Sequence, residues 1–183
     1  MTLPGANEGF PLLSVLIFSP LLGAAVAALI RDERILRWWT FLVAAAVGVK
    51  SVSLYTGFNT RTAAFQFGEL HSWIPTLHIN YALGVDGISL LLVLLTTLIT
   101  PLCVLASWKY IKTRVKEFMI CLLAMETAMI GVFCALDAIL FFLFWEAMLI
   151  PMALLIGVWG GPRKIYAALK FFIYTMADRK SVV

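Results

Sequence analysis

The sequence has 183 residues, of which 62% are hydrophobic and only 13% are charged, and its formal net charge is +4. Soluble domains carry about 25% charged residues, and a water-soluble domain of this length could not bury so much apolar surface. The composition therefore excludes a soluble protein. The basic residues stand in short connections between apolar stretches, which argues against a nucleic-acid partner.

Six apolar stretches follow one another along the chain, and a helix of about 20 apolar residues crosses roughly 30 Å of hydrocarbon. The sequence therefore predicts an all-α fold, a polytopic transmembrane helix bundle with about five complete spans and the start of a sixth. The first stretch is interpreted as a retained helix and not as a signal peptide, since Glu8 and not a basic segment precedes it. The six stretches are residues 9–30, 38–57, 87–108, 118–136, 138–159 and 163–177.

The basic residues of the connections predict the orientation, because cytoplasmic connections carry an excess of Lys and Arg. The first, third and fifth connections are basic, whereas the second, about residues 58–83, holds only Arg61 and the fourth is a bare turn near Asp137. The odd connections are therefore expected in the cytoplasm and the N-terminus outside. The basic residues in question are Arg31, Arg34, Arg37, Lys109, Lys112, Arg114, Lys116, Arg163 and Lys164.

The connections expected outside carry two further local signals. The second connection is too long for a simple turn, and its segment Ala64–Tyr81 contains aromatic residues, an alternating pattern and Pro75. This segment predicts either a hairpin that lies on the outer surface or a disordered loop. Asp86 and Asp137 directly precede the third and fifth spans, where N-capping residues are expected.

Two glutamates stand inside apolar spans. Glu126 lies ten residues after Lys116 and Glu146 lies nine residues after Asp137, so both carboxylates are expected near the middle of the bilayer, on neighbouring antiparallel helices. A charged carboxylate is costly there, and such residues are usually functional. Removal from water favours the protonated form, so these groups can exchange protons as a relay requires. The alternative is a permanent pair with a Lys or Arg that holds helices together.

Other residues within the spans bear on the same site. Pro151 removes a backbone hydrogen bond to Ala147 and is expected to loosen the helix beside Glu146. Lys170 either extends to the cytoplasmic surface or is the cationic neighbour of a buried glutamate, and Lys50 is interpreted as extending to the outer surface. The cysteines have no metal-ligand spacing and are interpreted as buried apolar side chains: Cys103, Cys121 and Cys134.

Four segments together resemble a known family, the antiporter-like membrane subunit M of bacterial NADH-quinone oxidoreductase, which is chain 4 of mitochondrial respiratory complex I. The resemblance covers roughly residues 10–176, and its 131–161 segment is long and specific. The matching segments are GVDGISLLLVLLT at 84–96, ME at 125–126, GVFCALDAILFFLFWEAMLIPMALLIGVWGG at 131–161 and YAALKFFIYT at 166–175.

The resemblance implies a proton-translocating subunit without redox chemistry of its own, in the inner membrane of a bacterial cell. It implies other membrane subunits of respiratory complex I as partners, together with the lipid bilayer. Its cofactors, NADH, flavin, iron–sulfur clusters and quinone, would be bound by other subunits, and no cofactor or metal is expected in this chain. By this resemblance Glu126 matches the glutamate of the family's fourth helix, Glu146 that of the fifth and Lys170 a lysine of the sixth, and the three would form the proton relay.

Two alternatives to this function remain open. A sodium/proton antiporter subunit or a membrane-bound hydrogenase subunit would share the paired glutamates, and a structural membrane subunit would lock them in ion pairs. The end of the chain departs from the family, since residues 178–183 read DRKSVV where more helices are expected. Residues 1–177 are therefore assigned to the antiporter-like domain, and 178–183 are interpreted as an aberrant tail of a C-terminally truncated sequence.

Overall fold

The computed structural model describes residues 11–62, 64–74 and 79–180, and in these ranges the chain forms six helices and one antiparallel hairpin. Five of the helices, α1 to α5, are long and apolar enough to cross a membrane. The predicted multi-pass helical bundle is therefore confirmed. The elements are α1 (Leu12–Leu29), α2 (Glu33–Gly57), β1 (Gln66–Ile74), β2 (Ile79–Val85), α3 (Gly87–Ser107), α4 (Val115–Cys134), α5 (Ala138–Trp159) and α6 (Lys164–Lys180).

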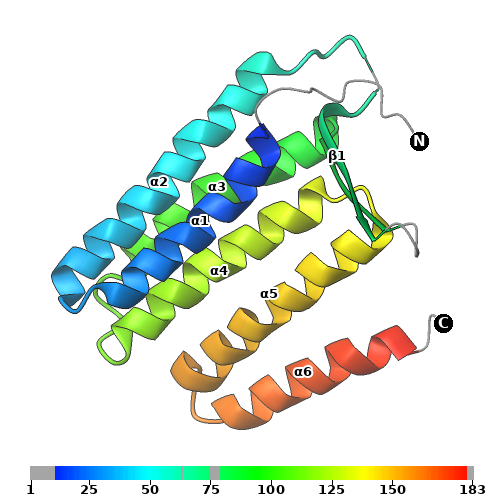
Figure 1. Ribbon diagram of the computed structural model, residues 1–183. Coiled ribbons are helices and arrows are strands. Elements are labelled where there is room, and N and C mark those ends of the chain that lie inside the picture. The colour runs from blue at the N-terminus through cyan, green and yellow to red at the C-terminus, as the bar shows by residue number, and fades with distance from the viewer. Residues whose placement is uncertain (1–10, 63, 75–78, 181–183) are drawn as a thin grey trace.

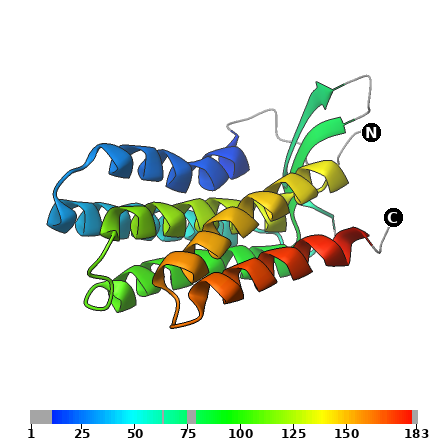
Figure 2. The same ribbon diagram turned by 90° about the horizontal axis from the view of Figure 1, so that it is seen from below.

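Helix α4 is the centre of the bundle. It packs against α1, α3 and α5, and α2 lies against α1 and α3 on the side away from α5 (Figure 1). Helix α6 packs mainly against α5 at the edge of the bundle, in both views (Figures 1 and 2). It has 17 residues and continues to Lys180, so the helix includes three residues of the segment interpreted as an aberrant tail.

The connections are sorted to the two ends of the bundle. The three basic connections lie together at one end, whereas the hairpin and the turn between α4 and α5 lie at the other (Figure 1). One expectation is corrected, because α2 begins at Glu33 and so includes Arg34 and Arg37 in its first turns. The Arg37 guanidinium donates to the carbonyl oxygens of Trp108 and Ile111, which ties α2 to the α3–α4 connection.

The second connection forms the hairpin and not a disordered loop. Strands β1 and β2 pair antiparallel, from Gln66 opposite Val85 to Ile74 opposite Ile79, with two irregularities in the register. The hairpin stands at one end of the helices (Figure 2), and its place on the outer side of the membrane stays a prediction. Pro75 lies outside the described residues.

The carboxylate of Glu69 fastens the hairpin to the beginning of α1. It is only 7% exposed and accepts hydrogen bonds from the backbone N–H groups of Leu13, at 2.7 Å, and Ser14, at 3.2 Å. The Ser14 hydroxyl also donates to it and lies 2.8 Å from the hydroxyl of Tyr81, whose pKa is raised by burial. Because Pro11 gives α1 no side-chain cap, Glu69 satisfies amides that helix termini otherwise leave unpaired.

Aspartates begin three of the helices. Asp86 accepts a 2.7 Å hydrogen bond from the Ser89 backbone, which holds the pKa of Asp86 below its usual value. Asp137 accepts from the Ile139 backbone at 2.9 Å, so both predicted N-caps are confirmed. Asp32 caps α2 in the same way.

Candidate functional site

Glu126 lies in the middle part of α4 and is completely buried, with 0% of its surface exposed. The Thr100 hydroxyl of α3 faces this carboxylate, yet it donates its hydrogen to the backbone oxygen of Thr96 at 3.0 Å. Among the residues that the structure describes, neither carboxylate oxygen has a hydrogen-bond partner. A buried polar group without a partner is costly, and native proteins keep few of them. This placement is therefore a functional signal in its own right.

Glu146 lies on α5 and is half-buried. Helix α5 continues through Pro151 without a break to its end at Trp159, and the loosening expected beside Glu146 stays a prediction. What proline removes is the one backbone hydrogen bond to the carbonyl of Ala147, the residue next to Glu146.

The two glutamates lie at the same level of neighbouring antiparallel helices. Glu126 is eight residues before the end of α4 at Cys134, and Glu146 is eight residues after the start of α5 at Ala138. At about 1.5 Å per residue, both lie about 12 Å from the turn. The turn is itself fixed, since the Leu136 backbone donates to the carbonyl of Ala82 in β2 at 2.9 Å.

A glycine brings α4 close to α5 between this level and the turn. A Cβ atom added at Gly131 would lie 2.4 Å from the Phe144 ring, much closer than such atoms approach. Phe144 is buried and belongs to the core cluster at this end of the bundle. The absence of a side chain at Gly131 therefore allows α4 and α5 to pack closely between the level of Glu126 and the turn.

Lys170, the third predicted site residue, lies apart from the bundle centre. Its side chain is exposed on α6, and its ammonium nitrogen lies 5.9 Å from the ring centre of Tyr166 and 5.5 Å from that of Tyr174. These tyrosines stand one turn before and one turn after it, so the lysine is held along the surface of α6 by cation–π contacts.

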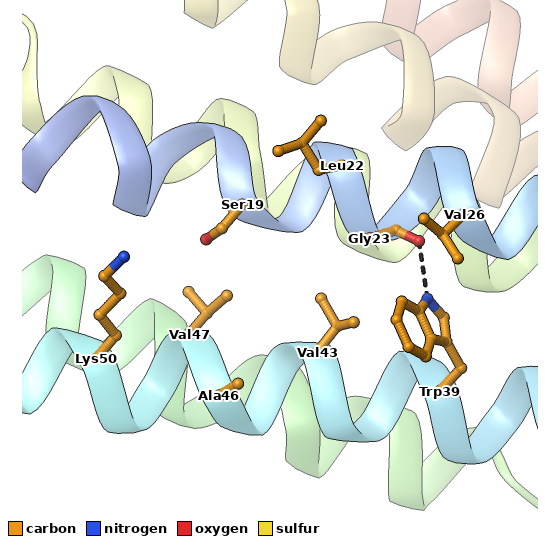
Figure 3. A pocket seen from close by; sticks show the side chains of 9 residues that line it. All are labelled: Ser19, Leu22, Gly23, Val26, Trp39, Val43, Ala46, Val47 and Lys50. Atoms are coloured by element: carbon orange, nitrogen blue, oxygen red, sulfur yellow. Dashed lines mark hydrogen bonds between the residues drawn. The ribbon is translucent and has the colours of Figure 1, made fainter.

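Lys50 borders a hollow of about 300 Å³ between α1 and α2. Figure 3 shows its side chain extending from α2 toward α1, on the same side as Ser19. At the other end of the hollow the Trp39 indole donates to the Gly23 carbonyl at 3.0 Å. The ammonium group is therefore placed beside an apolar helix interface, about 10 Å before the end of α2 at Gly57.

Two residues of interest are absent from the sequence predictions. Thr100 gives no signal because threonine is common in apolar spans, and its proximity to Glu126 depends on how α3 packs against α4. Glu69 stands in a connection, where an exposed acid is the usual expectation. Within residues 11–62, 64–74 and 79–180, no group of three or more His, Cys, Asp or Glu side chains is arranged to hold a metal ion.

Comparison with protein families gives two matches. The model described as NADH-ubiquinone oxidoreductase chain 4, amino terminus, matches residues 16–132. The model described as NADH:quinone oxidoreductase/Mrp antiporter, TM, matches residues 135–180.

Curated relatives match over most of this chain. NADH-quinone oxidoreductase subunit M of Rhodobacter capsulatus is 48% identical over 170 residues, which cover 90% of this chain and 33% of the relative. NADH-ubiquinone oxidoreductase chain 4 of Marchantia polymorpha is 42% identical over 170 residues, which cover 90% of this chain and 34% of the relative. The chain therefore spans about a third of the length of these relatives.

Solved structures share the fold. A chain of the Mrp complex from a Dietzia species superposes with a TM-score of 0.75 at 18% identity, covering 90% of this chain and 18% of that one. A chain of the membrane-bound sulfane sulfur reductase, an archaeal respiratory membrane complex, gives a TM-score of 0.73 at 23% identity, covering 91% and 25%. The helical arrangement described above therefore recurs in membrane complexes of this type.

Proposed function

Because the chain belongs to the family of NADH-ubiquinone oxidoreductase chain 4, we propose that it is the amino-terminal part of a proton-translocating membrane subunit of NADH:quinone oxidoreductase. Its relatives are named as subunits of that enzyme. The subunit would couple electron transfer from NADH to quinone, carried out by other subunits with their flavin and iron–sulfur clusters, to proton movement. Its partners would be the other membrane subunits of the complex, in the inner membrane of a bacterial cell.

The observation that carries this proposal is the pair of carboxylates at one level of α4 and α5. Glu126 is completely buried and without a hydrogen-bond partner among the described residues. If Glu126 belonged to a permanent structural ion pair, a cation would stand beside its carboxylate. Because the described residues give its oxygens no partner, the site favours a carboxyl group that gains and loses a proton. Glu146, half-buried at the same depth, is the next proton-binding group across the α4–α5 contact.

Within this proposal the residues have distinct parts. Glu126 holds a proton in the protein interior, where removal from water favours the neutral acid. Glu146 exchanges protons at the same level, beside the carbonyl that Pro151 leaves without its helical hydrogen bond. Lys170 would be the cationic member of the relay, and α6 would have to turn or shift to carry its ammonium from the two tyrosines toward α5.

The experiment uses the full-length gene in its respiratory complex. Glu146→Gln, which cannot carry a proton, is expected to abolish most quinone-dependent proton uptake by membrane vesicles while the complex assembles normally. Glu146→Asp is expected to keep part of the uptake, from a carboxylate about one methylene short. Normal uptake in Glu146→Gln would refute the relay. A proportional loss of assembly and uptake would favour a structural role, since an ion pair that loses its acid leaves a buried cation unpaired.

A sodium/proton antiporter subunit is the second candidate, because the family model that matches residues 135–180 is described as common to the oxidoreductase and the Mrp antiporter. The two functions differ in the driving reaction. Proton uptake that requires NADH and quinone supports the oxidoreductase. Proton movement that requires a sodium gradient, without NADH oxidation, would support the antiporter.

A further inference from the structure

Buried hydroxyl groups gather where α2, α3 and α4 meet. Thr96, Thr97 and Thr100 stand on α3 and Ser51 on α2, and none of the four is more than 7% exposed. All lie within spans, where polar side chains usually face the interior and interact with one another. Glu126 of α4 is completely buried, and the Thr100 hydroxyl faces its carboxylate.

Two of these hydroxyls join α2 to α3. The oxygen atoms of Ser51 and Thr97 lie 2.7 Å apart, and Ser51 also donates to the Gly48 carbonyl at 2.7 Å. Thr100 stands one turn further along α3, on the same face as Thr97. The hydroxyls therefore follow one face of α3, from the contact with α2 to the carboxylate of Glu126.

The hydrogen bond that Thr100 donates determines how its hydroxyl can interact with Glu126. Its hydrogen is given to the Thr96 carbonyl at 3.0 Å, so its oxygen can accept but not donate. An ionised carboxylate only accepts, whereas a protonated one has a hydrogen to give. In this arrangement Thr100 can bind Glu126 only while that glutamate is protonated, and this agrees with the absence of any donor to the carboxylate among the described residues.

We propose that Thr100 is a positioning residue that stabilises Glu126 in both of its protonation states by rotating its hydroxyl group. With Glu126 protonated, the acid O–H donates to the Thr100 oxygen, and the Thr100 hydrogen stays on the Thr96 carbonyl. When Glu126 passes its proton on, the Thr100 hydroxyl turns and donates to the carboxylate. The O–H bond of Thr100 is never broken, and the only bond that forms or breaks is that of the Glu126 proton.

This inference rests on the proposed proton relay and adds a residue to it. The Ser51–Thr97 contact spaces α2 from α3 one turn away, so rotation at Thr100 needs no movement of the helices.

The test compares three variants of the full-length subunit in its assembled complex. Thr100→Val removes the hydroxyl at nearly constant volume, Thr100→Ser keeps it, and Thr40→Val is the matched control. Thr40 is a similarly buried threonine on α2 whose hydroxyl donates to the Leu36 carbonyl of the same helix at 3.0 Å. The readouts are quinone-dependent proton uptake and the infrared carbonyl band of the protonated acid, assigned to Glu126 by its loss in Glu126→Gln.

Thr100→Val is expected to move the carbonyl band to higher wavenumber and to slow proton uptake on the order of fivefold to tenfold, as loss of one hydrogen bond to an acid predicts. Thr100→Ser and Thr40→Val should match the wild type in both readouts. An unchanged band in Thr100→Val, or no band that Glu126→Gln removes, would overturn the inference. Normal uptake in Glu126→Gln would instead refute the part given to Glu126 in the relay, whatever the band of Thr100→Val shows about the hydroxyl.

Discussion

Replacement of Glu69 by alanine tests how the hairpin holds the beginning of α1. The change removes the carboxylate that accepts from the Leu13 and Ser14 backbone N–H groups. The N-cap residue of α1 itself, Pro11, makes no side-chain hydrogen bond to these groups. Loss of such a cap costs about 0.5–2 kcal/mol, and loss of a partly buried negative charge at a helix N-terminus costs up to about 2 kcal/mol more. We therefore expect Glu69→Ala to lower the free energy of unfolding by about 2–3 kcal/mol.

For a protein of this size, about 1 kcal/mol corresponds to about 2–4 °C in melting temperature. Glu69→Ala should therefore lower the midpoint of thermal unfolding by about 5–10 °C, measured by tryptophan fluorescence of the purified protein in detergent. Glu69→Gln keeps one acceptor oxygen and should lower the midpoint of thermal unfolding by about half as much. Glu117→Gln removes an exposed acid from α4 and is the control. A Glu69→Ala protein that melts like the wild type would refute the capping role.

Three further predictions concern packing, pH and orientation. Gly131→Ala places a methyl group against the Phe144 ring and should destabilise the bundle by about 1–3 kcal/mol, with partial recovery in a Gly131→Ala, Phe144→Leu double variant that leaves room for the methyl. The pKa of Asp86 is lower in the folded protein than in the unfolded chain. Its cap therefore contributes its full stability above the pKa of the unfolded chain, about 4, and this contribution is lost as the pH falls through the lower pKa of the folded protein. In thermal melts between pH 6 and about pH 3, the Asp86→Asn variant should therefore not show this part of the fall in melting temperature. In a background without native cysteines, a membrane-impermeant thiol reagent on intact cells should label His71→Cys but not Lys112→Cys, and the reverse pattern would contradict the orientation.

The spans and the central glutamate were predictable because their signals are local. An apolar run of about 20 residues is visible in any window of that length, and Glu126 is conspicuous as the single charge within one. The equal depth of Glu126 and Glu146 followed from counting residues, because the rise of a helix is fixed. The aspartate caps were also predictable, since each bonds amides two or three residues away.

The interactions that depend on packing were not predictable in the same way. Glu69 bonds amides 55 and 56 residues earlier in the chain, and Arg37 bonds carbonyls more than 70 residues later. No periodicity connects such positions. The apolar run predicts a start of α2 after Arg37, whereas the helix begins at Glu33, because charged side chains fit the first turns of a helix that emerge from the membrane.

The position of the candidate relay depends on contacts outside the apolar core. Glu126 and Glu146 share a level because the α4–α5 turn lies eight residues from each. That turn is bonded to β2 through Ala82, and β1 is bonded to α1 through Glu69. The hairpin therefore joins α1, which packs on α4, to the turn that sets the depth of both carboxylates. A change in the hairpin should disturb proton transfer by moving the two acids relative to each other, whereas a change of either acid should disturb it by removing the proton-binding group with the helices still in place.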